Sequence, residues 1–238
     1  MNAANDAQAR TDATPRSFTL RALLITLVVI LIDQATKIVV LNTMQKGESI
    51  RLIGDWLRFT FTENPGMAFG IEYGPPALIT IFSIIATGLI ILYLRKVGHV
   101  YTPYRISLAL ILGGAIGNII DRVFYGMIVY DAPLFMGRVV DFIHVNVWRG
   151  YVSESVPLIG GKYLGLFPIW NVADMAIVLG VIGILFFQRK FHDRLEEIEQ
   201  ETASADSSAE YDSATIATPL IVGNPGSGDA DVPPEITT

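Results

Sequence analysis

Four long apolar segments, separated by polar stretches, dominate the hydropathy pattern of the 238-residue chain. They cover residues 20–41, 77–94, 106–120 and 167–187. The second has 18 residues and no charge, and a helix of that length rises about 27 Å, close to the thickness of a bilayer's hydrocarbon core. No small-x-small cleavage site follows the first segment, so we interpret it as a retained helix and not as a signal peptide. The pattern predicts four transmembrane helices.

The polar stretches between these segments predict a little β-structure outside the membrane. Residues 49–53 and 56–62 alternate as strands do, and Gly54 and Asp55 between them favour a turn. We therefore expect an all-α membrane protein with minor β, in which a small antiparallel sheet lies on the membrane surface. The octet 63–70 holds two glycines and a proline. It is either a turn back to the bilayer or, through Asn64, a donor and acceptor for an extended peptide.

Basic residues near the ends of the apolar segments predict the orientation. Lys and Arg are dense in the connector 95–105 and in residues 189–194, and arginines also flank the first segment. Such residues favour the cytoplasmic side, so both termini are expected there. The expected organisation is a disordered cytoplasmic segment 1–19, a membrane domain 20–190 with outer loops 42–76 and 123–166, and an acidic, disordered cytoplasmic tail 191–238.

With this orientation, polar and ionisable residues from distant segments meet at the outer edge of the membrane. They are Asp33, Asn64, Asn118, Asp121, Arg122, Asp141, Asn171 and Asp174. Such groups are costly to place at a bilayer, and those that are found there usually serve a function. The convergence predicts a functional site at the outer leaflet.

Composition narrows the chemistry of that site. The chain is 51% hydrophobic, has no cysteine and has only three histidines. Thiolate chemistry is excluded, and the histidines lack the spacing of a zinc site. No GxSxG motif and no basic patch for a nucleic acid are present. Carboxylates are the remaining candidates for catalytic groups. When two are held close, one proton is shared, and the pair can activate water and protonate a carbonyl oxygen without a cofactor or metal.

Local charge separates the candidate aspartates. Asp121 is followed directly by Arg122, and Asp33 has Lys37 one helical turn later, so ion pairs would keep both acids charged and structural. The Asp33–Lys37 pair has a second interpretation, a snorkelling pair at a helix end. Asp141 and Asp174 have no adjacent base and are therefore the better pair for catalysis.

Two further features of the sequence are expected to have no catalytic role. His144 follows Asp141 by three residues and is expected to be a surface residue of a loop. Gly113, Gly114 and Gly117 are expected to allow a neighbouring helix to approach closely.

Five blocks of sequence together resemble lipoprotein signal peptidase (signal peptidase II), the bacterial membrane aspartic peptidase. The blocks are Asp33-Gln34-x-x-Lys37, Asn64-x-Gly66-x-Ala68-Phe69, Gly113-Gly114-Ala115-x-Gly117-Asn118-x-x-Asp121-Arg122, Val139-Val140-Asp141-Phe142 and Phe167-x-x-x-Asn171-x-Ala173-Asp174. They occur in the family's order and cover roughly residues 20 to 190.

The resemblance implies that Asp141 and Asp174 are catalytic. It implies that Asn64, Gly66, Asn118, Arg122, Asn171 and Ala173 line or support the substrate site, together with Asp33 and Lys37. It also implies cleavage of a diacylglyceryl-modified prolipoprotein just before its lipidated cysteine, at the outer leaflet of the bacterial inner membrane. The fold implied is four transmembrane helices plus an extracytoplasmic β-cradle. The expected partners are the prolipoprotein and membrane lipid, with no nucleic acid and no metal, and the expected state is a monomer.

The chain departs from the family pattern in two places, both beside Asp141. An insert at residues 127–138 and a long glycine-containing loop before Phe167 are expected to extend an outer lid. Asp131 in the insert is expected to be solvated.

Two other classes of function fit parts of the pattern. A transporter also carries buried polar groups, but its site would lie near the midplane and its halves would often repeat. A structural membrane protein would explain the glycines but not Asp141 and Asp174.

Overall fold

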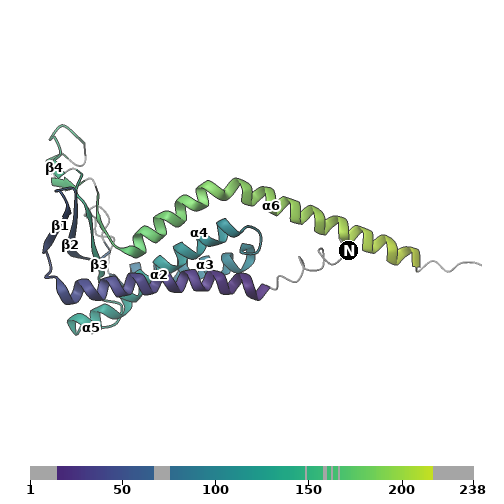
Figure 1. The fold of residues 1–238 in the computed structure, drawn as a ribbon, viewed down its shortest axis with the longest axis horizontal. Helices are drawn as coiled ribbons and strands as arrows, with labels where there is room; N and C mark the ends of the chain where they lie inside the picture. Colours follow the sequence, from purple (N-terminus) through teal and green to yellow (C-terminus); the bar gives the residue numbers. More distant parts are fainter. Residues whose placement is uncertain are drawn as a thin grey trace, which may run out of the picture. The chain divides into compact units, whose positions relative to one another are not determined.

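The computed structural model describes residues 15–66, 76–147, 149–157, 160–161, 163–165 and 167–216 (Figure 1). Its elements are, in chain order, α2 (Pro15–Thr43), β1 (Ser49–Ile53), β2 (Leu57–Asn64), α3 (Pro76–Val97), α4 (Thr102–Ile120), the π-helix η1 (Asp121–Tyr125), α5 (Gly126–Tyr130), β3 (Val139–Val145), β4 (Arg149–Tyr151), β5 (Tyr163–Gly165), β6 (Ile169–Trp170) and α6 (Val172–Ile216).

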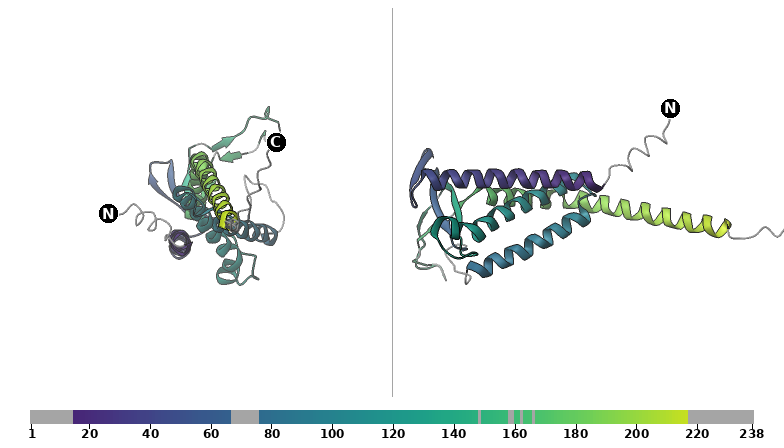
Figure 2. Two further views of the ribbon diagram at one scale, coloured as in Figure 1. Left: turned by 90° about the vertical axis from the view of Figure 1, so that its right-hand side faces the viewer. Right: turned by 90° about the horizontal axis from the view of Figure 1, so that it is seen from below.

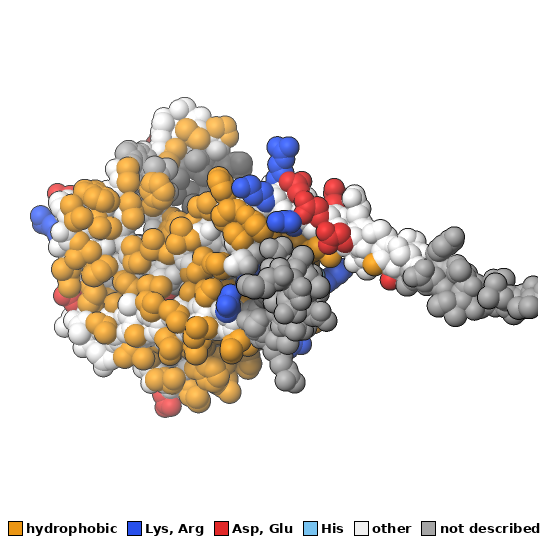
Figure 3. Space-filling view, turned by 45° about the vertical axis from the view of Figure 1, so that its right-hand side comes forward, with side chains coloured by type: hydrophobic (Ala, Val, Ile, Leu, Met, Phe, Trp, Pro, Cys, Tyr) orange, Lys and Arg blue, Asp and Glu red, His pale blue; other side chains and the backbone are white. Residues whose placement is uncertain are grey.

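Among the described residues, four helical segments are long and apolar enough to cross a membrane, as predicted. They span Leu20–Thr43, Ala77–Val97, Thr102–Tyr130 and Val172–Ser208. The third is the most enclosed, with 56% of its most apolar stretch buried, against 28%, 11% and 17% for the others. It therefore forms the centre of the bundle. Hydrophobic side chains cover the face of the bundle seen in Figure 3, as lipid contact requires.

Small residues on α4 bring its neighbours close, as expected for the glycine-rich stretch. A Cβ atom on Gly113 would lie 2.7 Å from Val29 on α2, and one on Gly114 would overlap the backbone carbonyl of Ala173 on α6. The Thr26 hydroxyl donates to the Ala109 carbonyl at 3.1 Å, which adds a polar contact between α2 and α4. The packing interpretation of these glycines is confirmed.

An antiparallel sheet, ordered β1-β2-β3-β6, lies at one end of the bundle, which we call the sheet end (Figures 1 and 2). The predicted pair of strands is confirmed as β1 and β2, which are joined at Gly54 and Asp55. Strand β3 pairs with β2 so that Asp141 lies opposite Thr62 and Val139 opposite Asn64. The sheet therefore carries Asn64 and Asp141 on adjacent strands.

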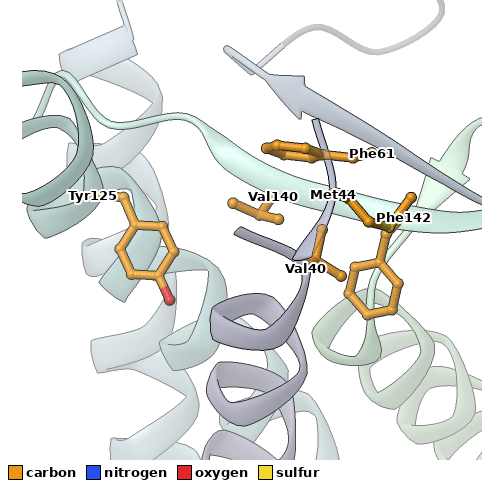
Figure 4. Close-up of a cluster of buried hydrophobic side chains, with 6 residues drawn as sticks. All are labelled: Val40, Met44, Phe61, Tyr125, Val140 and Phe142. Atoms are coloured by element: carbon orange, nitrogen blue, oxygen red, sulfur yellow. The ribbon is translucent and has the colours of Figure 1, made fainter. Parts of the chain in front are cut away.

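A hydrophobic cluster fastens the sheet to the bundle (Figure 4). It contains Val40, Met44, Phe61, Tyr125, Val140 and Phe142, which come from α2, its C-terminal extension, β2, η1 and β3. Val140 and Phe142 alternate with Asp141 along β3, so the cluster fixes which face of the strand carries the carboxylate.

The last span begins later than predicted. Residues 167–170 include the short strand β6, and α6 starts only at Val172. Pro168 disfavours a helical residue before it, and Asn171 precedes the helix as a cap. The prediction that the helix begins at Phe167 is therefore wrong.

The third helix runs beyond its predicted end at Ile120. It passes through η1 and continues as α5 to Tyr130, and residues 131–137 return along it. The return segment satisfies carbonyls of the π-helix, because Gly137 N–H donates to Arg122 O at 3.0 Å and Phe135 N–H donates to Val123 O at 3.2 Å. The insert expected in a lid thus packs on the third helix. Asp131, at the turn, is exposed as predicted.

Helix α6 continues in sequence to Ile216, so the tail predicted to be disordered from residue 191 is helical as far as Ile216. Residues 191–216 contain no glycine or proline and several good helix formers, which explains the extension. Residues from Glu196 onward form a unit separate from Met1–Leu195.

We expect truncation after Leu195 to leave the peptidase activity implied by the resemblance intact, because every residue predicted for the site lies within Met1–Leu195. The truncated chain should retain the kcat and KM of the full chain for that activity. A large loss of turnover by truncated protein that remains monodisperse and helical would contradict this.

Candidate active site

A buried lysine lies at the centre of the polar cluster. Lys37 Nζ is 2.8 Å from Asp33 Oδ2 and 2.7 Å from Asp121 Oδ2, and all three side chains are 0% exposed. The ammonium group also donates to Asn118 Oδ1 at 3.1 Å. Gly117 makes room for this cluster, since a Cβ there would lie 2.6 Å from Asp33 Oδ2. Loss of Lys37 would leave two carboxylates buried without a cation, at a cost of about 3–5 kcal/mol or more.

These contacts revise two interpretations made from the sequence. The Asp33–Lys37 pair is confirmed, but the complete burial of both side chains excludes the snorkelling alternative. Asp121 does pair with a cation, which is Lys37 on α2; within the described part of the chain no ion pair joins it to Arg122. Adjacent helical residues point in different directions, so the neighbour in sequence was the wrong partner.

The N-terminus of α6 is capped by the site itself. Asn171 Oδ1 accepts from the Asp174 backbone N–H at 2.9 Å, and Asp174 Oδ2 accepts from the Asn171 N–H at 3.3 Å. This reciprocal pair is a capping box with Asp174 at the third helical position. Asp33 Oδ1 accepts from the Ala173 N–H at 2.9 Å. A free N-terminal N–H of the helix thus anchors the α2 carboxylate.

Two asparagines connect Asp141 with Asp174. Asn171 Nδ2 donates to Asp141 Oδ1 at 2.7 Å and to Asn118 Oδ1 at 3.2 Å. Asn118 Nδ2 donates to Asp174 Oδ1 at 2.8 Å. Because Lys37 can only donate, Asn118 must turn its oxygen toward the ammonium group and its nitrogen toward Asp174. Lys37 thereby determines that the amide nitrogen of Asn118, and not its oxygen, faces Asp174.

Asp141 is held by its strand and is poorly solvated. It is 2% exposed, and the backbone N–H of the preceding residue, Val140, donates to Asp121 Oδ2 at 3.2 Å. Burial and then the nearby charge of Asp174 raise the pKa of Asp141 from 3.8 to about 8, against hydrogen bonds from Asn171 and Asn64. At neutral pH this carboxyl group therefore favours a proton.

The structure also places the other residues predicted for the site. Asn64 Oδ1 accepts from the Gly66 N–H at 2.8 Å, and Gly66 has φ +106°, which favours glycine. Ala173 is fully buried. Arg122 interacts electrostatically with Asp174, Asp121 and Asp141. Its Nε atom is buried and has no hydrogen-bond partner in the described part of the chain. Ala68 and Phe69 of the second block lie outside the described residues.

Two residues of the network were missed by the sequence analysis. Gln34 Nε2 donates to Asp121 Oδ1 at 3.0 Å and to Asp33 Oδ2 at 3.1 Å, and the Tyr125 hydroxyl donates to Gln34 Oε1 at 3.0 Å. Gln34 belongs to the sequence block Asp33-Gln34-x-x-Lys37, but its contacts depend on the fold and could not be predicted from that block. Tyr125, one turn after Asp121, carried no signal of its own.

His144 is buried rather than a surface residue of a loop, so that prediction is wrong. It is 3% exposed in β3, and its Nδ1 lies 2.8 Å from the Thr60 hydroxyl on the paired strand. The alternation of β3 explains the position, because the strand extends past Asp141 to Val145.

The arrangement suits hydrolysis by a carboxylate pair. One carboxyl group with a raised pKa and a second carboxylate nearby can share a proton, activate water and protonate a carbonyl oxygen. Such a pair within four membrane-spanning helices defines the class of protein as a membrane-embedded aspartic protease.

Comparison with known proteins makes the assignment more specific. The family model for signal peptidase (SPase) II matches residues 25–189. The lipoprotein signal peptidase of Amoebophilus asiaticus is 36% identical over 208 residues, covering 82% of this chain and 86% of the relative. That of Porphyromonas gingivalis is 36% identical over 191 residues, covering 72% and 83%. The chain therefore belongs to the signal peptidase II family, aspartic proteases that remove signal peptides from prolipoproteins.

Solved structures agree with this fold. Two structures, each titled as a bacterial membrane enzyme structure by the in meso method, at 2.3 and 1.9 Å resolution, are 29% and 30% identical to this chain. Their TM-scores are 0.55 and 0.53, and they cover 71% and 70% of this chain and 88% and 90% of their own.

The raised pKa of Asp141 predicts how pH affects stability. Between pH 3.8 and about 8 the folded protein keeps a proton that the unfolded chain has released, so this group's stabilising contribution is lost as pH rises through that window. In the Asp141→Asn variant the side chain cannot ionise, but its amide oxygen can still accept the hydrogen bond from Asn171 Nδ2. We expect its thermal midpoint to match that of wild type near pH 4 and to exceed it by several degrees at pH 8–9. A constant difference across this range would contradict the prediction.

Removal of the Tyr125 hydroxyl should disturb the network without touching either member of the pair. Tyr125→Phe leaves Gln34 Oε1 without its donor, at a cost of about 1–3 kcal/mol in stability, and we expect kcat to fall several-fold with KM nearly unchanged. Tyr93→Phe is the matched control, because it removes a hydroxyl contact of 3.2 Å to Tyr104 elsewhere in the bundle. Steady-state kinetics of both variants test this; equal kcat values would refute it.

Proposed function

We propose that Asp141 and Asp174 are the catalytic pair and share one proton in the resting enzyme. The observation that carries this is the bridge through Asn171 and Asn118, which holds both carboxylates on one network. In the forward step the ionised member takes a proton from water as the water attacks the scissile carbonyl carbon. The protonated member gives its proton to the carbonyl oxygen. Collapse of the tetrahedral intermediate breaks the C–N bond. The carboxyl group that took the water proton protonates the leaving amine, and the other carboxylate takes a hydroxyl proton from the intermediate, which restores the shared proton.

Arg122 and Asn64 are proposed to position the substrate. The guanidinium group lies in the field of three carboxylates, and its buried Nε offers a donor that no described residue uses. Asn64, at the end of β2, hydrogen-bonds Asp141 and stands where an extended peptide would reach the pair. Both residues can therefore orient the scissile peptide by hydrogen bonding.

The substrate class is proposed to be a diacylglyceryl-modified prolipoprotein, cleaved just before the lipidated cysteine. An apolar cavity of about 490 Å³ supports this, because it begins two residues from Asn64. Its lining is Gly66, Leu78, Ile79, Phe82, Ser83 and Ala86. A cavity of this character next to the peptide site fits an acyl chain, which gains free energy when it is shielded from water.

The orientation proposed places both termini in the cytoplasm and the sheet end at the outer leaflet of the bacterial inner membrane. Arg95 and Lys96 end α3 at the opposite end of the bundle, in agreement with the positive-inside rule. A single chain contains both carboxylates and every described member of the network, so a monomer suffices for the chemistry.

Substitution of either aspartate should abolish cleavage. Asp141→Asn and Asp174→Asn, purified in detergent and mixed with diacylglyceryl-modified prolipoprotein, are expected to release signal peptide at least about 10³-fold more slowly than wild type. Asp131→Asn, at an exposed position, is the matched control and should remain active. A chelator should have no effect, since the mechanism uses no metal. Near-normal cleavage by either folded variant would refute the assignment of the pair.

A further inference from the structure

Residues 126–137, which we call the finger, expose an apolar surface at the sheet end of the bundle. It comprises α5 and the return segment that follows. Its large hydrophobic side chains are 37% to 68% exposed: Met127, Ile128, Val129, Tyr130, Leu134, Phe135 and Met136. The finger has one acidic residue, Asp131, and no lysine or arginine. Among the described residues, the hydrophobic cluster that packs the sheet on the bundle includes none of these side chains.

Although its apolar side chains are exposed, the backbone of the finger is well packed. Besides the two hydrogen bonds to the π-helix, Ala132 N–H donates to Gly126 O at 3.0 Å. Gly126 and Gly137 pack backbone against backbone, since a Cβ on Gly126 would lie 2.8 Å from the Gly137 nitrogen. The finger therefore presents its side chains on a fixed frame, and its fold does not bury them.

The apolar surface of the finger begins at Phe124, just before it, which is 43% exposed. Ile106, near the other end of the same helix, is 39% exposed, and residues 107–123 between them are buried or half-buried. The membrane-spanning segment itself runs from Thr102 to Tyr130. Figures 1 and 2 show α5 beside the bundle at the end where the sheet lies. The apolar exterior of the bundle thus extends past the polar cluster.

The helix rise gives the depth of that cluster. Tyr130 lies nine residues beyond Asp121 and Thr43 six residues beyond Lys37, which corresponds to about 13 Å and about 9 Å along the two helices. The α2 surface is also apolar past Lys37, because Ile38 and Val39 are 53% and 58% exposed. Two separate helices therefore carry lipid-type surface beyond the level of the site.

We propose that the finger is inserted among the lipid acyl chains of the leaflet at the sheet end. Tyr130 and Asp131 then stand at headgroup level, where an aromatic residue and a charge are favoured. The buried Asp33–Lys37–Asp121 cluster then lies roughly 9–13 Å below that level. Exposure of the finger's apolar surface to water would be unfavourable, because apolar area that contacts water raises the free energy.

The absence of native cysteine allows a direct test. Ile128→Cys and Leu134→Cys carry a nitroxide label, and the protein is reconstituted in nanodiscs of phosphatidylethanolamine and phosphatidylglycerol. Relaxation enhancement by oxygen, which concentrates in acyl chains, is compared with enhancement by a water-soluble nickel chelate. Leu89→Cys, on the exposed face of α3, is the membrane control, and Ser155→Cys, in an exposed loop, is the water control.

Both finger labels should resemble Leu89→Cys, with an oxygen-to-nickel ratio several-fold above that of Ser155→Cys. A ratio like that of Ser155→Cys would overturn the proposal, because the finger would then lie in water. Protection from both reagents would overturn it in favour of a second copy of the chain or another protein on this surface. The two positions lie on opposite arms of the finger, so one misfolded variant leaves the other to decide. The readout does not depend on catalysis and stays separate from the test of the aspartate pair.

Discussion

A lysine ammonium group sealed from solvent between two carboxylates is the contact on which the rest of the site depends. Lys37 pairs with Asp33 and Asp121, and each of these acids uses its remaining acceptor capacity elsewhere. Asp33 binds the first turn of α6, and Asp121 binds the backbone beside Asp141. One buried cation thus ties together two transmembrane helices, the start of a third and the central strand of the sheet.

A buried ion pair is a weak argument for stability, because desolvation offsets much of the attraction. Apolar side chains of similar volume could fill the same space. They could not orient Asn118, however, or accept from the Ala173 and Val140 backbone groups. We therefore infer that the cluster serves to position groups. It fixes the orientation of the Asn118 amide and the position of the backbone at Ala173 and Val140, and proton transfer requires such precision.

Much of this architecture could be predicted from residue patterns, for reasons that are local. Apolar length predicts the spans, and alternation predicts β1 and β2. The absence of a neighbouring cation singles out Asp141 and Asp174 among the acids, and their catalytic role stays a prediction. The misses involve partners brought together only by folding. Asp121 meets Lys37 across 84 positions, and the hydroxyl of Tyr125 meets Gln34 across 91. The burial of His144 and the start of α6 also depend on the sheet, whose edge strand β6 has only two residues.

The capping box at Asn171 and Asp174 makes one of the two carboxylates proposed for catalysis part of the folding of α6. Until α6 has formed and docked, Asp174 has neither its backbone partner nor the bridge to Asp141. The spans emerge from synthesis in order, and α6 is the last of them. A partly inserted chain therefore contains most of the membrane domain but lacks the bridge between the two carboxylates that we propose as the catalytic pair. On that proposal, activity begins only when the membrane domain is complete.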